Sequence, residues 1–291
     1  MPRWFILSVF AVVCWGLWAI LSKLIGESVT AAQSQALSTL GLLPVMLALG
    51  ASKKLTATGN RPRGIRNAIL AGGLSCVGNV AYYHALNVGG KASTVVPLTA
   101  LYPLVTIVLA VIFLRERLNP VQLVGIALSL VSIYLFNVGS AAGVVNAWLI
   151  YALIPIGLWG ISGLLQKIST NDISGELSTL WFLAAFVPVG GLLLLLQPLA
   201  GPVAVKTWLL VSGLGLFFSL GNLALLAAFA NHGKASIIAS ICGLYPLVSV
   251  PIAVFFLGEK ISPRETVGIV LALVAVVALA MEKPSARAAA V

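Results

Sequence analysis

The feature that most constrains the fold is a series of apolar runs separated by short polar, charged or Gly/Pro-rich breaks. A helix of about 20 apolar residues crosses the hydrocarbon core of a bilayer. Helices are predicted because unpaired backbone groups in lipid cost several kcal/mol each and because the runs are too long for barrel strands. The sequence therefore predicts an all-α polytopic membrane protein with ten transmembrane helices, near 4–25, 31–50, 67–87, 93–114, 121–138, 146–168, 175–197, 207–230, 235–257 and 264–281.

Composition supports this class and excludes others. Of the 291 residues, 60% are hydrophobic and only 8% are charged, which is more apolar surface than a soluble core can hide. Seven acidic residues and two histidines leave little for hydrolytic or metal chemistry, so we expect no enzyme, no metal site and no cofactor. Cys14, Cys76 and Cys242 lie within apolar runs and are interpreted as small core residues.

The net charge of +10 comes from residues in the breaks between apolar runs. If the N-terminus lies inside, 12 of the 17 Lys and Arg residues fall on the inner side. The positive-inside rule then predicts that both termini are cytoplasmic, and no nucleic-acid partner is needed to explain the charge. The loop 51–66 contributes most of the asymmetry. It either touches anionic lipid or only marks topology.

The chain repeats itself with a shift of 143 residues. Gly78-Asn79 matches Gly221-Asn222, and Leu101-Tyr102-Pro103-Leu104-Val105 matches Leu244-Tyr245-Pro246-Leu247-Val248. In all, 25 of the 57 positions from 78 to 134 are identical to their partners. With a shift of 144, Trp15-Gly16 matches Trp159-Gly160, and Lys23 matches Lys167.

The repeat unit holds five predicted spans, and an odd number makes the second copy enter the membrane from the opposite side. We therefore predict two inverted five-helix repeats, residues 1–139 and 146–283, with a linker at 140–145 and a short tail at 284–291. Secondary transporters use this architecture because two equivalent halves can exchange conformations. A duplicated scaffold without transport is the alternative.

These motifs resemble the EamA-type members of the drug/metabolite transporter superfamily. The resemblance rests on the five-plus-five layout, the Trp-Gly…Lys ends of spans one and six, and the Gly-Lys-Ala-Ser…Leu-Tyr-Pro run of spans four and nine. It implies an inner-membrane carrier, often an exporter of amino acids or other small metabolites. It also implies a central cavity lined by spans one to four and six to nine, with spans five and ten peripheral.

Spans one and six carry the first candidate cavity residues. Lys23 and Lys167 either snorkel to the interface or contact a substrate carboxylate or phosphate. Trp15 and Trp159 lie two turns deeper on the same face, where they either pack the helix core or stack on substrate.

Span three carries Asn79, Tyr82, Tyr83 and His84, and span eight carries Asn222. The two buried amides either join helices or contact substrate. His84 is either a satisfied structural histidine or a proton-coupling site.

Spans four and nine contain Tyr102-Pro103 and Tyr245-Pro246 near mid-membrane. Proline removes a backbone donor and kinks a helix, so Pro103 and Pro246, together with Pro97 and Pro251, are candidate hinges. The tyrosines beside them are either packing residues or cavity walls. The helix starts at Ser93 and Ser236 favour an anion through their free amides.

No Asp or Glu lies in the interior of any span. Small multidrug pumps of the same superfamily couple to protons through a glutamate of the first span, so the resemblance disfavours proton antiport of cationic drugs here. We expect export or exchange of a neutral, zwitterionic or anionic metabolite, such as an amino acid. The alternatives are a flippase for a lipid-linked or polyprenyl-linked small molecule and an exchanger of phosphorylated sugars or nucleotide sugars. The expected partners are the substrate and the bilayer, and association as a homodimer stays open.

Overall fold

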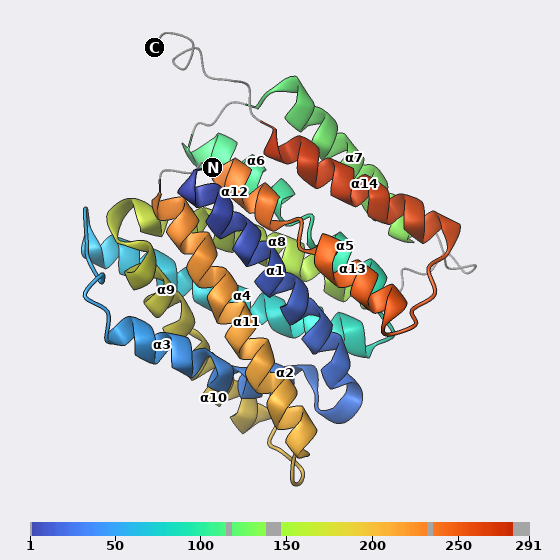
Figure 1. Ribbon diagram of the computed structural model, residues 1–291, viewed down its shortest axis with the longest axis horizontal. Helices are drawn as coiled ribbons and strands as arrows, with labels where there is room; N and C mark the ends of the chain where they lie inside the picture. Colours follow the sequence, from blue (N-terminus) through green and yellow to red (C-terminus); the bar gives the residue numbers. More distant parts are fainter. Residues whose placement is uncertain (1, 115–117, 138–146, 232–234, 282–291) are drawn as a thin grey trace.

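The computed structural model describes residues 2–114, 118–137, 147–231 and 235–281. Within these ranges the chain is helical and forms no strand beyond one isolated bridge between Ala57 and Ile173. The predicted linker 140–145 and tail 284–291 lie outside the described residues. Figure 1 shows the helices packed as one bundle, with α7 and α14 side by side at one edge.

Each predicted span coincides with helical residues. The first repeat contains α1 (Arg3–Ile25), α2 (Ala31–Ser38), α3 (Leu43–Gly50), α4 (Arg61–Asn87), α5 (Ala92–Thr99), α6 (Pro103–Leu114) and α7 (Pro120–Asn137). The second contains α8 (Ala147–Asp172), α9 (Gly175–Ala184), α10 (Phe186–Leu196), α11 (Val205–Ala230), α12 (Ala235–Cys242), α13 (Pro246–Phe255) and α14 (Pro263–Ala280). Short 3-10 turns cover Gly26–Ser28 and Thr39–Leu42.

Seven of these segments are long and apolar enough to cross a membrane, judged by length and composition. They are Arg3–Ile25, Ala31–Gly50, Ala92–Phe113, Ala147–Asp172, Gly175–Leu196, Val205–Ala230 and Ile237–Phe255. Pro120–Phe136 is a shorter apolar helix. The membrane class is therefore supported, while a crossing by all ten predicted spans goes beyond these seven.

Four of the ten predicted spans are broken helices. The break between α5 and α6 falls at Tyr102-Pro103, and that between α12 and α13 falls at Tyr245-Pro246. Backbone bonds to the third preceding residue cross both breaks, as in Tyr102 N–H to Thr99 O (3.1 Å) and Tyr245 N–H to Cys242 O (3.3 Å). Proline has no N–H to continue the α-helical ladder, which accounts for the interruption.

Spans two and seven are also broken, between α2 and α3 and between α9 and α10. Pro44 and Pro188, one at the start of each second half, are related by the 144-residue shift. The starts of these spans are equivalent as well, because the side chain of Thr30 caps α2 and that of Ser174 caps α9.

The two repeats pack through exchanged partners. α1 lies along α11, and α4 lies along α8, so each long pair takes one helix from each repeat. Glycines permit the close approach. A Cβ atom at Gly78 would lie 2.6 Å from Nε1 of Trp159, and one at Gly221 would lie 2.5 Å from Nε1 of Trp15.

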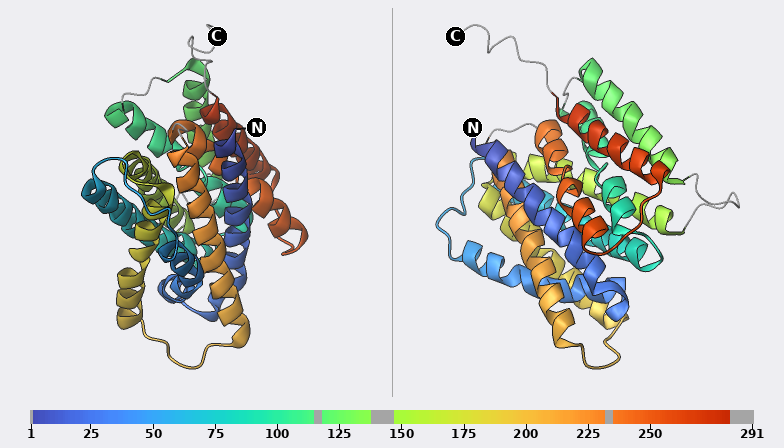
Figure 2. Two further views of the ribbon diagram at one scale, coloured as in Figure 1. Left: turned by 60° about the vertical axis from the view of Figure 1, so that its left-hand side comes forward. Right: turned by 45° about the vertical axis from the view of Figure 1, so that its right-hand side comes forward.

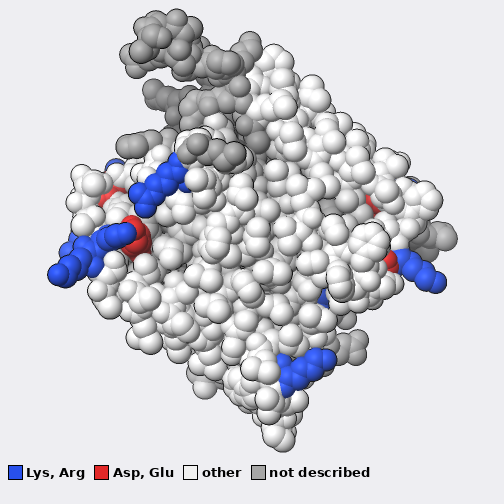
Figure 3. All heavy atoms as spheres, viewed as in Figure 1, with Lys and Arg blue, Asp and Glu red and all other residues white. Residues whose placement is uncertain are grey.

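The ends of the helices show how the repeats run. In Figure 1 and in the right-hand view of Figure 2, α1 begins on the same side of the molecule as α14 ends, whereas α8 begins on the opposite side. Figure 3 shows Lys and Arg side chains gathered at opposite edges and an uncharged surface between them. An apolar band between two charged margins is the surface expected of a protein embedded in a bilayer.

Candidate functional site: an aromatic pocket between the repeats

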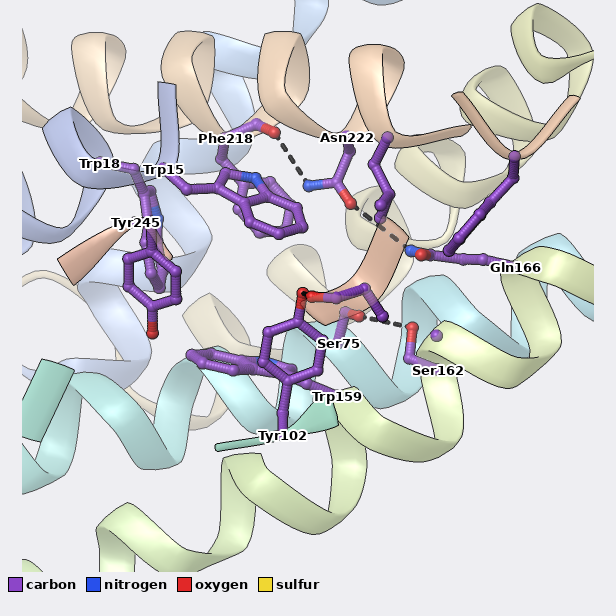
Figure 4. A pocket seen from close by; sticks show the side chains of 14 residues that line it. Trp15, Trp18, Ser75, Tyr102, Trp159, Ser162, Gln166, Phe218, Asn222 and Tyr245 are labelled. Atoms are coloured by element: carbon purple, nitrogen blue, oxygen red, sulfur yellow. Dashed lines mark hydrogen bonds between the residues drawn. The ribbon is translucent and has the colours of Figure 1, made fainter. Parts of the chain in front are cut away.

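A pocket lies where the two repeats meet. Its empty volume is about 530 Å³, including open space at its mouth. Figure 4 shows side chains from both repeats converging on it. The walls consist of Trp15, Trp18, Ser75, Tyr102, Trp159, Ser162, Gly163, Gln166, Phe218, Asn222, Leu225, Phe229, Ala239 and Tyr245.

The two equivalent tryptophans form the centre of the aromatic wall. Trp15 contacts Tyr245 edge to face at 6.4 Å between ring centroids, and Trp159 contacts Tyr102 in the same way at 6.3 Å. Each indole is backed by a glycine of the opposite repeat, as described above. The sequence equivalence of Trp15 and Trp159 therefore becomes an equivalence of position.

The two tyrosines at the helix breaks make equivalent hydrogen bonds across the repeats. The hydroxyl of Tyr102 donates to the carbonyl of Ala239 at 3.1 Å, and that of Tyr245 donates to the carbonyl of Val96 at 3.4 Å. Val96 and Ala239 are themselves related by the 143-residue shift. Each tyrosine thus ties its own broken helix to the broken helix of the other repeat.

The polar wall of the pocket consists of amides and hydroxyls. The Asn222 amide donates to Phe218 O (2.9 Å), and its oxygen accepts from Gln166 Nε2 (3.4 Å). Ser75 and Ser162 share a hydrogen bond of 2.8 Å. Among the described residues, the lining contains no Lys, Arg, Asp or Glu, so the contacts that it offers are hydrogen bonds and aromatic surfaces.

The pocket is asymmetric along its length. Toward the side on which α1 begins, its lining includes Gln166 and Phe229, which lie near the ends of α8 and α11. At the other end Trp18 is 3% exposed, stacks on Tyr82 with ring centroids 4.8 Å apart and donates through Nε1 to the Tyr83 hydroxyl at 3.1 Å. We call Trp18, Tyr82 and Tyr83 the aromatic plug.

Five of the predicted cavity residues line this pocket: Trp15, Tyr102, Trp159, Asn222 and Tyr245. Tyr82 and Tyr83 belong to the aromatic plug, which borders the pocket through Trp18. Whether any of these side chains contacts a substrate stays a prediction.

Lys23 and Lys167 lie outside the pocket lining. The ammonium of Lys23 donates to the carbonyl of Gly90 at 2.9 Å, and that of Lys167 donates to the carbonyl of Phe229 at 3.3 Å. Each lysine therefore joins the end of its helix to the last turn of a neighbouring helix or to the loop after it. Their predicted contact with an anionic substrate group stays a prediction.

Asn79 and His84 also lie outside the lining. Asn79 is 1% exposed, and its Oδ1 has no hydrogen-bond partner among the described residues. The His84 ring contacts the Tyr151 ring at 4.2 Å between centroids. The two repeats differ at both positions. The equivalent of Asn79 is Asn222, which lines the pocket, and the equivalent of His84 is Ala227.

The prolines sit where the helices break or within their halves. Pro103 and Pro246 begin α6 and α13, while Pro97 and Pro251 lie inside α5 and α13. Hinge motion at these prolines stays a prediction. No group of three or more metal-ligating side chains occurs within the described ranges.

Several lining residues were not among the sequence candidates, including Trp18, Ser75, Ser162, Gln166 and Phe218. The repeat itself held a signal for them. Trp18 is equivalent to Ser162, and Ser75 to Phe218, so the two members of each pair exchange an aromatic ring for a hydroxyl. The signal is therefore a difference between equivalent positions, whereas the sequence candidates were mostly residues that are identical in the two repeats.

A helical membrane bundle with two repeats and a pocket between them defines a polytopic membrane protein of the transporter class. The model of the EamA-like transporter family matches residues 2–138 and 146–281, once for each repeat, so the chain belongs to that family. The resemblance drawn from the sequence motifs is confirmed. Members of this family are membrane transporters of small molecules, so a membrane transporter is the class that the fold and the family support together.

Two further similarities agree with this assignment. The chain is 29% identical over 135 residues to "Uncharacterized protein MJ1333.1" of Methanocaldococcus jannaschii, a match that covers 46% of this chain and 96% of the relative. It also superposes on a protein of known crystal structure with a TM-score of 0.69, at 17% identity and 94% coverage of each chain. The first match has the length of one repeat, and the second concerns the fold alone.

Proposed function

We propose that this protein is a secondary transporter that crosses the inner membrane ten times, as two inverted five-helix repeats, and moves a small metabolite by alternating access. The inversion is supported by the helix ends, since α1 and α8 begin on opposite sides. The excess of Lys and Arg on the side where α1 begins supports a cytoplasmic location for both termini.

The observation that carries the proposal is a pocket with matched central walls and unmatched ends. Trp15 with Tyr245 and Trp159 with Tyr102 form equivalent walls, as alternating access requires of two exchangeable halves. At one end the wall is the stacked Trp18–Tyr82 pair, whereas at the other it holds the smaller Ser162 and Leu225 at the equivalent positions. An aromatic stack at the outer end alone supports loading from the cytoplasm, and therefore export.

The lining chemistry favours a neutral or zwitterionic metabolite, such as an amino acid with an apolar or aromatic side chain. Three indoles, two phenols and Phe218 offer apolar and stacking contacts, and the Asn222–Gln166 pair offers hydrogen bonds. A phosphorylated sugar would need cationic partners in the pocket, and the lining supplies none.

The first test is a thermal-shift screen of the purified protein with amino acids, sugar phosphates, nucleotides and quaternary amines. A ligand that binds the folded state raises the apparent melting temperature by mass action. We expect a rise with one or more amino acids and none with sugar phosphates. A rise confined to sugar phosphates or nucleotides would overturn the proposed substrate class.

Counterflow of the radiolabelled ligand in proteoliposomes then tests transport, with a lipid-scrambling assay on the same vesicles. We expect counterflow without scrambling, and slower counterflow in Asn222→Ala at ligand concentrations that do not saturate the site. Scrambling without counterflow would replace the carrier by a flippase. Tags at the two ends of the chain should both be reached from the cytoplasm, and tags on opposite faces would contradict the inverted repeats.

A further inference from the structure

A second concave site lies on the outer surface, away from the pocket between the repeats. It is a groove with an empty volume of about 860 Å³, including open space, where α4 begins beside α9. Its walls are Arg61, Pro62, Ile65, Arg66, Ile69 and Leu70 of α4 and Trp181 of α9. All but the last come from the first three turns of one helix.

The groove carries two cations without a counter-charge. Arg61 and Arg66 are exposed, and neither guanidinium has a hydrogen bond or an ion pair to any part of the chain that the structure describes. Arg63, between them, is used differently. It forms a two-pronged ion pair with Asp172, with Nε 2.6 Å from Oδ2 and Nη2 2.8 Å from Oδ1.

That ion pair fixes the start of α4 against the end of α8. The Asp172 carboxylate accepts hydrogen bonds from Arg63, which raises the pKa of that guanidinium above its ordinary value. Asp172 also accepts from the backbone N–H of Asn60 at 3.2 Å. With Arg63 and Asp172 paired, the groove is left with a net positive charge on a fixed helix end.

The rest of the groove is apolar and exposed. Ile69 is 39% exposed, Leu70 49% and Trp181 36%. Ile69 and Leu70 lie about one turn beyond Arg66 and about two turns beyond Arg61 on α4, and Trp181 lies beside them on α9. Figure 3 shows Lys and Arg at the edge where α4 begins. Tryptophan is enriched at the level of lipid headgroups. The groove thus passes from cationic to apolar in the direction in which a lipid passes from headgroup to acyl chain.

We propose that this groove binds one anionic phospholipid of the cytoplasmic leaflet. Its headgroup phosphate pairs with Arg61 and Arg66, and an acyl chain covers Ile69, Leu70 and Trp181. Basic pockets at the cytoplasmic ends of transmembrane helices bind anionic headgroups in this way. A soluble phosphate would satisfy the arginines but would leave the apolar wall uncovered. The inference does not depend on which metabolite is transported.

The experiment is native mass spectrometry of the full chain titrated with dioleoylphosphatidylglycerol or dioleoylphosphatidylcholine. We expect the wild-type protein to bind the anionic lipid in preference to the zwitterionic one. The variant Arg61→Gln/Arg66→Gln should bind the anionic lipid about 30-fold more weakly, since each basic residue near the membrane surface contributes about 1 kcal/mol. Equal binding of the two lipids by the wild-type protein would overturn the proposal.

Three further measurements keep the test sharp. The control variant Lys53→Gln/Lys54→Gln removes the same charge from the preceding loop, outside the groove. If it lost as much affinity for the anionic lipid, binding would reflect general electrostatic attraction to this face, and the groove would not be a specific site. Trp181→Ala keeps both arginines, and unchanged lipid binding in that variant would exclude the apolar wall. Competition by soluble glycerophosphoglycerol would show a phosphate site and would overturn the lipid assignment, whereas we expect none.

Discussion

Trp18 stacks on Tyr82, with ring centroids 4.8 Å apart and 23° between the ring planes. The equivalent positions of the second repeat hold Ser162 and Leu225, and both line the pocket. The same pair of positions therefore closes the pocket at one end and borders it at the other. Because the sequences differ here, the two ends need not be equally stable when closed.

Thiol labelling tests which end is accessible. In a background with Cys14, Cys76 and Cys242 replaced by Ala, we expect Gln166→Cys to react with an impermeant maleimide from the cytoplasmic side. Ser22→Cys, at the equivalent position, should be protected because Ser22 is hydrogen-bonded to Tyr82 of the aromatic plug at 3.3 Å and does not line the pocket, whereas Gln166 does. Labelling of Ser22→Cys with protection of Gln166→Cys would show the opposite accessibility.

Trp18→Ala should weaken the closed end. It removes the stack on Tyr82 and the hydrogen bond to Tyr83, together worth about 1 to 3 kcal/mol, which shifts the ratio of two states by about 5- to 150-fold. Ser22→Cys in this variant should then be labelled from the outer side. The matched change Ser162→Ala, in the second repeat, should leave that labelling rate unchanged. Protection in both variants would remove the plug from the closing mechanism.

Tyr102→Ala and Tyr245→Ala should each impair counterflow without loss of expression, because each tyrosine forms a wall of the pocket and joins the two broken helices. The phenylalanine variants keep the ring contacts with the tryptophans and lose only the hydroxyl bonds, of Tyr102 to Ala239 O (3.1 Å) and of Tyr245 to Val96 O (3.4 Å) and Thr99 Oγ1 (3.0 Å). They should retain most of the ligand-induced thermal shift. Normal counterflow in both alanine variants would exclude the tyrosines from the transport site.

Asn222→Ala and Asn79→Ala form a matched pair across the repeats. We expect Asn222→Ala to weaken ligand binding by about twofold to tenfold, the contribution of one neutral hydrogen bond. Asn79→Ala should leave binding unchanged and cost little stability, since its buried Oδ1 has no partner among the described residues. Isothermal titration of the two variants measures both effects. Equal losses of ligand affinity in the two variants would show that both amides act through helix packing and would contradict a direct contact between Asn222 and the ligand.

Gly72 and Gly73 are neighbours in α4 with opposite surroundings. A Cβ at Gly72 would meet the carbonyl of Phe182 and lie 2.9 Å from the Cβ of Ala185, whereas a Cβ at Gly73 would meet nothing within 4 Å. Gly72→Ala should therefore destabilise the folded protein by about 1 to 3 kcal/mol through overpacking, which lowers the melting temperature in detergent. Gly73→Ala should raise it slightly, because alanine favours a helix by about 0.5 to 1 kcal/mol. A stable Gly72→Ala protein would contradict the close contact between α4 and α9.

Much of the fold follows from the sequence, because apolar runs of membrane length and a five-span repeat leave few arrangements. The Tyr-Pro pairs also predict the breaks in spans four and nine. The breaks at Pro44 and Pro188 were not predicted, although the same 144-residue shift relates them. A proline near the end of an apolar run gives no sign of whether the helix continues past it.

The site was harder to predict, and the reason is geometric. Trp15, Trp159 and the two tyrosines were found because the repeat conserves them. Lys23 and Lys167 were equally prominent, but backbone carbonyls lie within reach of their ammonium groups and hold them outside the pocket lining. Which carbonyl lies near a side chain depends on helix packing, and no spacing in the sequence records it.

Because α1 pairs with α11 and α4 pairs with α8, the repeats that arose by duplication are not the bodies expected to move as rigid units. A rearrangement that preserves both pairs, the second clamped by Arg63 and Asp172, moves two composite bodies, each built from both halves of the duplicated chain. Neither half can then shift alone. A mutation in one repeat then changes the packing of a body that the other repeat helps to form, so we expect substitutions in the two repeats to be coupled during evolution.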